Sequence, residues 1–203
     1  MVAIYMQLLR EECGDRLDDK ALSFIDQSLK AARRMETLLQ ALLAYSLVTA
    51  PAPDKSEADA NAAAQDAIGN LESLIARTEA TVTIGDLPRV RLPSVRLTQV
   101  LQNLVGNSIK YRREGVPPRI EIQAAWHGGC RWLFSVRDNG MGIAPQYLNQ
   151  IFGIFKRLHG LDYEGTGIGL AICQRIVENT DGKIWAESEE GVGTTMKFTL
   201  PGV

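Results

Sequence analysis

The sequence predicts an α+β protein, in which an N-terminal helical hairpin precedes an α/β sandwich with one mixed sheet covered by helices. Two observations lead to this fold class. Residues 1–48 carry only helical periodicity, and from residue 61 onward helical patterns alternate with short strand-like runs. The chain has 203 residues, 45% of them hydrophobic and 23% charged, which is enough apolar material for one good core and a smaller second one.

The first 48 residues predict two helices. Residues 1–13 are apolar on one side, a polar break follows, and a long run continues to about residue 48. Apolar residues of that run recur at a mean step of about 3.5, which is typical of a helix-bundle seam; they are Leu22, Ile25, Leu29, Ala32, Met35, Leu39 and Leu42. Two helices alone cannot bury this stripe, so we expect a homodimer that forms a four-helix bundle. The alternative is one amphipathic hairpin packed on the rest of the chain.

The remainder predicts a linker and a larger domain. Residues 49–60 contain two prolines with small and charged residues, which indicates a linker, and the domain follows over 61–203. We expect helices within 61–78, 93–112, 145–152 and 169–182, the last ending at Gly182 as its C-cap. Two short strands around a Gly-Asp turn are expected within 81–92, and hairpins over 119–138 and 183–201.

Charge and composition exclude several classes of function. The net charge is −2, so nothing indicates binding to nucleic acid or to an anionic membrane. No apolar run is long enough to span a bilayer and no signal peptide precedes the first helix, so we expect a cytoplasmic protein without membrane insertion. Cys13, Cys130 and Cys173 form no C-x-x-C pair, which argues against a disulfide framework or a zinc site, and we expect all three to be buried.

Three alternating glycines, Gly165, Gly167 and Gly169, lead into an apolar helical run. They fit neither a Walker loop, because no Gly-Lys-Ser/Thr follows, nor a Rossmann fingerprint, because the preceding segment is polar rather than strand-like. Their backbone N–H groups could still face an anion, with the positive end of the helix near Leu170 pointing back at the loop. A phosphate cradle and a plain flexible turn both remain open for this segment.

Two further stretches favour a nucleotide site. Asp138 follows a predicted strand and opens the segment Asp-Asn-Gly-Met-Gly-Ile, where its carboxylate could meet the exocyclic amine of adenine; as structure alone, this segment is a common turn. Asn103, Asn107 and Lys110 share one face of a predicted helix. Amide oxygens can coordinate Mg²⁺ and a nearby lysine can meet phosphate, although an ordinary polar helix face has the same pattern.

Taken together, these stretches resemble the ATP-binding domain of sensor histidine kinases, which belongs to the gyrase, heat-shock chaperone, histidine kinase and MutL superfamily. The resemblance covers about residues 95–201, and its segments occur in the family's order and approximate spacing: 103–111, 138–143, 151–160, 165–172 and 191–201. It implies a Bergerat-type sandwich. Residues 1–48 resemble the second half of a dimerisation and phosphotransfer hairpin of phytochrome-type and other soluble-sensor kinases.

The resemblance implies ATP and Mg²⁺ as cofactors, with Asn107 as the metal ligand and Asp138 on the adenine amine. Thr195 would hold a water against adenine. Residues 155–166 would form a mobile lid, with Phe152 and Phe155 as its anchors and Lys156 or Arg157 as its contact to the terminal phosphate. The other residues implied around the nucleotide are Asn103, Lys110, Tyr111, Gly140, Gly142, Ile143, Gly165, Thr166, Gly167, Gly169 and Leu170.

Asn103 also bears on the reaction that the resemblance implies. Members of the superfamily that hydrolyse ATP carry a glutamate at this position as the base for water, and an amide cannot deprotonate water usefully. The site would therefore hold the terminal phosphate for another acceptor, largely by positioning and charge neutralisation.

The family's acceptor histidine would fall roughly two helical turns before Met1. His127 and His159 are the chain's histidines, and we expect both to be exposed loop residues rather than acceptors. Either a longer kinase has been trimmed, removing its acceptor and upstream sensor domain, or the chain naturally lacks the acceptor.

The resemblance implies a protein-histidine kinase whose phosphate passes on to a response-regulator receiver domain. This chain alone would not phosphorylate itself. The alternatives are a non-enzymatic adaptor dimer with a structural nucleotide domain, and a kinase acting on serine or threonine of a separate regulatory partner.

Overall fold

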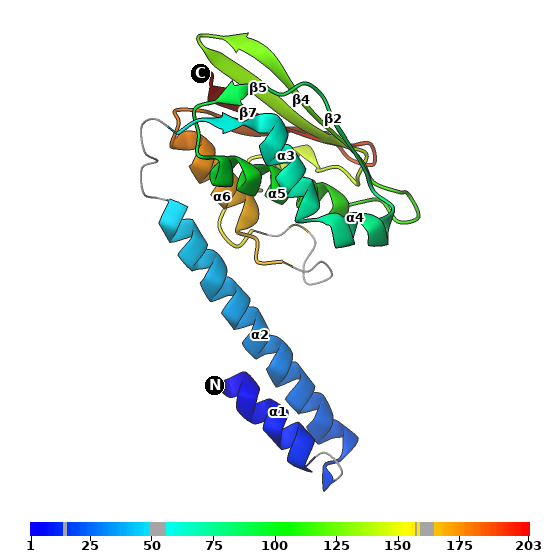
Figure 1. Cartoon of the computed structure of the whole chain (residues 1–203). Coiled ribbons are helices and arrows are strands. Elements are labelled where there is room, and N and C mark those ends of the chain that lie inside the picture. Colours follow the sequence, from blue (N-terminus) through cyan, green and yellow to red (C-terminus); the bar gives the residue numbers. More distant parts are fainter. Residues whose placement is uncertain (14–15, 49–55, 157, 159–164) are drawn as a thin grey trace. The chain divides into compact units, whose positions relative to one another are not determined.

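The computed structural model describes residues 1–13, 16–48, 56–156, 158 and 165–203 (Figure 1). The chain divides into two compact units, Met1–Ala44 and Tyr45–Val203. The boundary lies close to the end of the predicted helical part.

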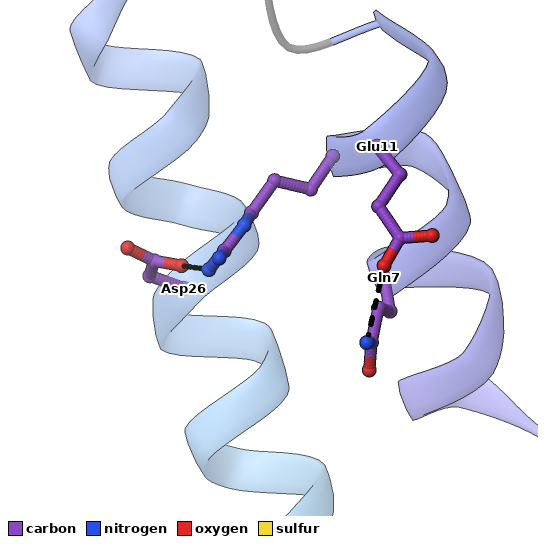
Figure 2. A network of polar contacts seen from close by, with 4 residues as sticks. Gln7, Glu11 and Asp26 are labelled. Carbon is purple, nitrogen blue, oxygen red and sulfur yellow. Dashed lines mark hydrogen bonds and ion pairs between the residues drawn. The ribbon is translucent and has the colours of Figure 1, made fainter.

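The first unit contains helix α1 (Val2–Cys13) and most of helix α2 (Asp19–Val48), so both predicted helices are confirmed. Along α1 Gln7 donates a hydrogen bond to Glu11, and Arg10 forms an ion pair with Asp26 of α2 at 2.9 Å (Figure 2). Both partners of the ion pair are more than half exposed to solvent, so the pair contributes little stability.

The apolar stripe of α2 is covered only in part. Ile25 and Leu29 are buried, whereas Met35, Leu39 and Leu42 are exposed. The predicted seam therefore has a covered first half and an exposed second half among the residues that the structure describes.

The predicted linker extends too far toward the second unit. Residues 49–55 lie outside the described residues, but Ala58–Asp59 form strand β1, which pairs antiparallel with β3 (Arg89–Val90). Ala58 and Ala60 are buried. Small residues are common in linkers, which explains the prediction, but here they are packed in the interior of the second unit.

A five-stranded sheet forms the centre of the second unit, in the order β2-β4-β5-β7-β6. Its strands are β2 (Thr81–Ile84), β4 (Arg119–Gly128), β5 (Arg131–Asp138), β6 (Ile184–Glu189) and β7 (Gly193–Pro201). β2 pairs parallel with β4 and the other pairs are antiparallel, so the predicted mixed sheet and both predicted hairpins are confirmed. The strands expected around the Gly-Asp turn, β2 and β3, form but belong to different sheets.

Helices α3 (Ala60–Gly69), α5 (Ser94–Lys110) and α6 (Gly169–Glu178) lie on one face of the sheet, as predicted (Figure 1). The core forms between them because alternate strand residues point to that face. Phe134 of β5 and Phe198 of β7 stack there with ring centroids 5.0 Å apart. The helices contribute buried residues at helical spacing, among them Leu97, Leu101 and Leu104 of α5 and Ile172 and Ile176 of α6.

Three predicted helix boundaries differ from the structure. The helical pattern over 61–78 divides into α3 and α4 (Glu72–Thr78), and the segment 145–152 contains only a 3₁₀ turn, η2 (Pro145–Tyr147). Helix α6 ends at Glu178 with Asn179 as its C-cap, so Gly182 is not the cap. A Cβ at Gly182 would overlap the carbonyl oxygen of Thr199, and close packing against β7 therefore explains this glycine.

The cysteines differ in exposure. Cys173 is buried as predicted, and burial raises the pKa of its thiol to about 12. Cys13 is half-buried, and Cys130 is exposed at the β4–β5 turn, so the prediction of burial is wrong for Cys130. None of the helices that the structure describes has the length and apolar character needed to cross a membrane.

Candidate functional site

Two adjoining cavities lie in the second unit beside α5. The first, the aspartate cavity, has an empty volume of about 680 Å³ and is bordered by Ser108, Asp138 and Thr194. The second, the asparagine cavity, has about 860 Å³ and is bordered by Asn103 and Lys110. The cavities share the lining residues Asn107, Tyr111, Ile151, Lys156 and Leu170, so together they form one elongated site.

Asp138 ends strand β5, and three donors hold its carboxylate. Oδ1 accepts the backbone N–H groups of Gly140 at 2.9 Å and Thr194 at 3.0 Å. Oδ2 accepts the hydroxyl of Ser108 at 2.9 Å. Burial raises the pKa of Asp138 above its ordinary value, and the three hydrogen bonds oppose that rise. A carboxylate has about four acceptor positions, which leaves one for a ligand beside the bonds that the described residues make.

Glycines allow three segments of chain to meet around Asp138. A Cβ at Gly140 would lie 2.7 Å from the carbonyl oxygen of Tyr111, which accepts the N–H of Met141 at 3.0 Å. Gly142 has a φ of +74°, and a Cβ there would overlap the carbonyl oxygen of Glu189. In the structure, Gly140 and Gly142 allow neighbouring backbone segments to approach one another closely.

The asparagine cavity has a polar floor on α5 and a glycine wall. Asn103, Asn107 and Lys110 all line it, as the helical spacing predicted. The glycine segment lies directly over them: a Cβ at Gly169 would be 3.0 Å from Asn103 Oδ1, and one at Gly165 would be 2.8 Å from Lys110 Nζ. Helix α6 begins at Gly169, so its positive end borders the same space.

The ammonium group of Lys110 lies over the ring of Tyr111, another residue of the site. Its Nζ lies 4.6 Å from the centroid of the Tyr111 ring, a cation–π contact between a residue of the asparagine cavity and a residue that both cavities share. Lys156 lines both cavities, so two cationic side chains border the site.

Most of the site residues expected from the sequence line one or both cavities. These are Asn103, Asn107, Lys110, Tyr111, Asp138, Gly142, Ile143, Lys156, Gly165, Thr166, Gly167, Gly169 and Leu170. Gly140 contacts Asp138 without lining either cavity. Arg157 and lid residues 159–164 lie outside the described residues.

Two residues expected at the site, Phe155 and Thr195, line neither cavity. Phe155 lines neither cavity and is 51% exposed, whereas Phe152 is half-buried; the anchoring of the predicted lid stays a prediction, because lid residues 157 and 159–164 lie outside the described residues. Thr195 points to the opposite face of the sheet, because successive strand residues alternate between faces. Thr194 lies on the cavity side of the strand instead: it is buried, lines the aspartate cavity, and its Oγ1 lies 2.9 Å from the hydroxyl of Ser188.

Sequence reasoning missed Ser108, Thr194, Met141, Ile151 and Met196. A signal for Ser108 existed. It continues the apolar stripe Leu97, Leu101 and Leu104 at helical spacing, so the sequence places a polar side chain on the face of the helix that is otherwise apolar.

The donor set of the site suits a metal bound together with phosphate better than a metal bound by protein alone. Among the described residues no group of three or more His, Cys, Asp or Glu side chains could hold a metal ion. Asn103 and Asn107 present amide oxygens beside Lys110, and Mg²⁺ typically takes one or two protein ligands plus phosphate oxygens and water.

A family model matches more than half of the chain. Residues 93–203 match the family described as histidine kinase-, DNA gyrase B-, and HSP90-like ATPase. Cyanobacterial phytochrome A of Nostoc sp. (strain PCC 7120) is 46% identical over 201 residues, which are 98% of this chain and 26% of that protein. The chain thus spans about a quarter of the length of the curated relatives it matches.

Solved structures share the fold. Full-length ShkA in complex with AMPPNP matches 98% of this chain and 42% of its own, with a TM-score of 0.71 and 24% identity. Histidine kinase ThkA in complex with the response regulator protein TrrA matches 98% of this chain and 57% of its own, with a TM-score of 0.67 and 22% identity.

The close backbone contact at Gly142 leads to a stability prediction. Gly142→Ala should lower the free energy of unfolding by about 1–2 kcal/mol from its positive φ and by about 1–3 kcal/mol more from the clash with Glu189. Gly115→Ala is the matched control, because its φ is +71° but nothing lies within 4 Å of a Cβ there. Urea unfolding followed by fluorescence measures both variants, since the three tryptophans lie in the second unit. Equal losses would contradict the role of the contact.

The raised pKa of Asp138 leads to a pH prediction. The folded protein keeps the Asp138 proton to a higher pH than the unfolded chain does. Wild-type protein should therefore lose stability relative to Asp138→Asn as the pH rises from the ordinary aspartate pKa through the raised one. Urea unfolding of both proteins over a pH series measures the difference between their free energies of unfolding. If wild-type protein instead gained stability relative to Asp138→Asn as the pH rises, the prediction would be wrong.

Proposed function

Because this chain belongs to the family of histidine kinase-, DNA gyrase B- and HSP90-like ATPases, we propose that its second unit is the ATP-binding catalytic domain of a sensor histidine kinase. The reaction would transfer the terminal phosphoryl group of ATP to a protein histidine. The observation that carries the proposal is a half-buried, hydrogen-bonded carboxylate, Asp138, at one end of an elongated cavity whose other end is bordered by amides, lysines and a glycine segment.

Asp138 would bind the adenine. Its half-buried carboxylate accepts hydrogen bonds from the protein and has an acceptor position left for the exocyclic amine. The rest of the aspartate cavity is largely apolar, with Leu104, Met141 and Met196 in its wall, as a purine ring requires. Thr194 replaces Thr195 in this proposal as the threonine beside the base.

The asparagine cavity would bind the phosphates. Lys110 and Lys156 would offset phosphate charge, and the N-terminus of α6 adds a positive dipole end and unpaired N–H groups. Asn107 would hold Mg²⁺ jointly with phosphate oxygens, and the ion would neutralise charge on the transferred group. We further propose Arg157 as a cationic contact to the terminal phosphate and the segment 155–166 as a lid over the triphosphate.

Asn103 supports transfer rather than hydrolysis. Its amide oxygen lies at the glycine segment, and an amide cannot act as a general base toward water. The residues around the terminal phosphate would thus orient it for an incoming imidazole. His127 is exposed on β4 and lines neither cavity, so we propose an acceptor other than His127 or His159.

The first unit, with the sequence as far as residue 48, would serve as part of a dimerisation and phosphotransfer hairpin. The exposed half of the α2 stripe supports a homodimer, because a second copy would cover Met35, Leu39 and Leu42. A receiver domain of a response regulator would take the phosphate next, as the complex of ThkA with TrrA suggests for that kinase. We place the whole protein in the cytoplasm, with a sensor domain upstream.

An adaptor without nucleotide is the competing reading, and nucleotide binding separates the two. Asp138→Asn should weaken binding of a fluorescent ATP analogue at least about tenfold. The NH₂ group of the introduced asparagine is a donor, and it must face either the amine of adenine or the N–H groups of Gly140 and Thr194, which are donors too. Asp86→Asn, an exposed carboxylate outside both cavities, is the matched control and should bind like wild type. Absence of binding by wild-type protein with Mg²⁺ would favour the adaptor.

The acceptor proposal predicts no self-phosphorylation. The chain incubated with γ-labelled ATP and Mg²⁺ should bind nucleotide but carry no acid-labile, alkali-stable label, because neither histidine of the chain serves as acceptor. Electrophoresis followed by autoradiography measures this. Label that disappears in His127→Ala or His159→Ala would identify an internal acceptor and refute this part of the proposal.

A further inference from the structure

Ser108 is a buried polar residue in the otherwise apolar face of α5. Its side chain is 5% exposed, and Leu101, Leu104 and Val105 around it on the helix are fully buried. Burying a hydroxyl in such surroundings is costly unless it is hydrogen-bonded, and alanine would form the helix better. Helix stability therefore does not explain a serine at this position.

The hydroxyl of Ser108 donates outside its own helix. A serine within a helix commonly donates to the carbonyl oxygen four residues before it. Ser108 instead donates its single proton to Oδ2 of Asp138 at 2.9 Å, on a strand thirty residues later in the chain. The hydroxyl also borders the aspartate cavity, so it lies beside any group that Asp138 binds there.

The other donors to Asp138 hold a different oxygen. The N–H groups of Gly140 and Thr194 both reach Oδ1, which leaves the Ser108 hydroxyl as the donor to Oδ2 among the described residues. The bonds to Oδ1 restrain Oδ2 only indirectly, because a small tilt of the carboxylate plane about Oδ1 still changes the direction of the free acceptor position on Oδ2. The Ser108 hydrogen bond removes that freedom and fixes the direction of the remaining acceptor position.

We infer that Ser108 is a positioning residue for base specificity: by orienting Asp138, it makes the site select purine nucleotides that carry an amino group at the six position. The inference rests on the proposed function, because it requires that a nucleotide base occupies the aspartate cavity. It adds a residue that touches the recognising carboxylate and directs it.

The chemistry supplies a direct test. The triphosphate of purine riboside differs from ATP only in lacking the six-amino group, so it keeps the phosphates, the sugar and the ring. A loss confined to ATP reports on recognition of the amine, whereas a loss shared by both nucleotides reports on the general integrity of the cavity.

The experiment measures dissociation constants of the full chain for both nucleotides with Mg²⁺ by isothermal titration calorimetry. Wild-type protein should prefer ATP over the analogue. Ser108→Ala should weaken ATP binding by about tenfold, the value of one hydrogen bond to a charged group, and leave the analogue unchanged. Ser108→Thr keeps the hydroxyl and should keep the preference. Ser135→Ala removes a hydroxyl from the opposite face of the sheet and should behave like wild type.

The outcomes separate two failures. If wild-type protein binds neither nucleotide, the proposed function fails and this inference falls with it. If wild type prefers ATP and Ser108→Ala keeps the same ratio of constants, or loses both affinities equally, the inference alone is overturned. Should Ser108→Ala not fold, Ser108→Cys replaces it: its weakly donating thiol should lose the preference that Ser108→Thr retains, and equal ratios would overturn the inference.

Discussion

The hydrogen bonding of one half-buried carboxylate, Asp138, organises the site. Asp138 lies at the end of β5, where burial disfavours its charge, and donors from α5, its own turn and β7 oppose that cost. The donors come from separate segments, so the orientation of the carboxylate depends on how these segments pack together. The packing of these segments at this end of the sheet therefore also shapes the aspartate cavity.

Glycines make that arrangement possible. Gly140, Gly142 and Gly193 stand where a side chain would collide with the backbone of a neighbouring segment, respectively at Tyr111, Glu189 and Asp138 itself. The backbone contacts are the consequence: Met141 donates to Tyr111, and Gly191 donates to Met141 at 2.7 Å. These glycines therefore allow close backbone packing, and the aspartate cavity lies between the packed segments.

The two ends of the elongated site differ in charge, as the uncharged base and the anionic phosphates of a nucleotide do. The aspartate cavity combines one acceptor with apolar walls, and the asparagine cavity combines lysines, amides and a helix N-terminus. Tyr111 lies between them and holds Lys110 at its ring face. This polarity gives a ligand one orientation, and it links the proposed recognition of the base to the proposed position of the terminal phosphate.

The sequence by itself determined the features that depend on near neighbours. Helical spacing placed Asn103, Asn107 and Lys110 on one face of α5, and alternation with turn residues located the two hairpins. Contacts between distant segments required the tertiary structure: the parallel pairing of β2 with β4, the packing of Ala58 and Ala60, and the bond from Ser108 to Asp138. The exchange of Thr195 for Thr194 has the same origin, because a one-residue difference in register reverses the face of a strand, and only pairing with neighbouring strands sets that register.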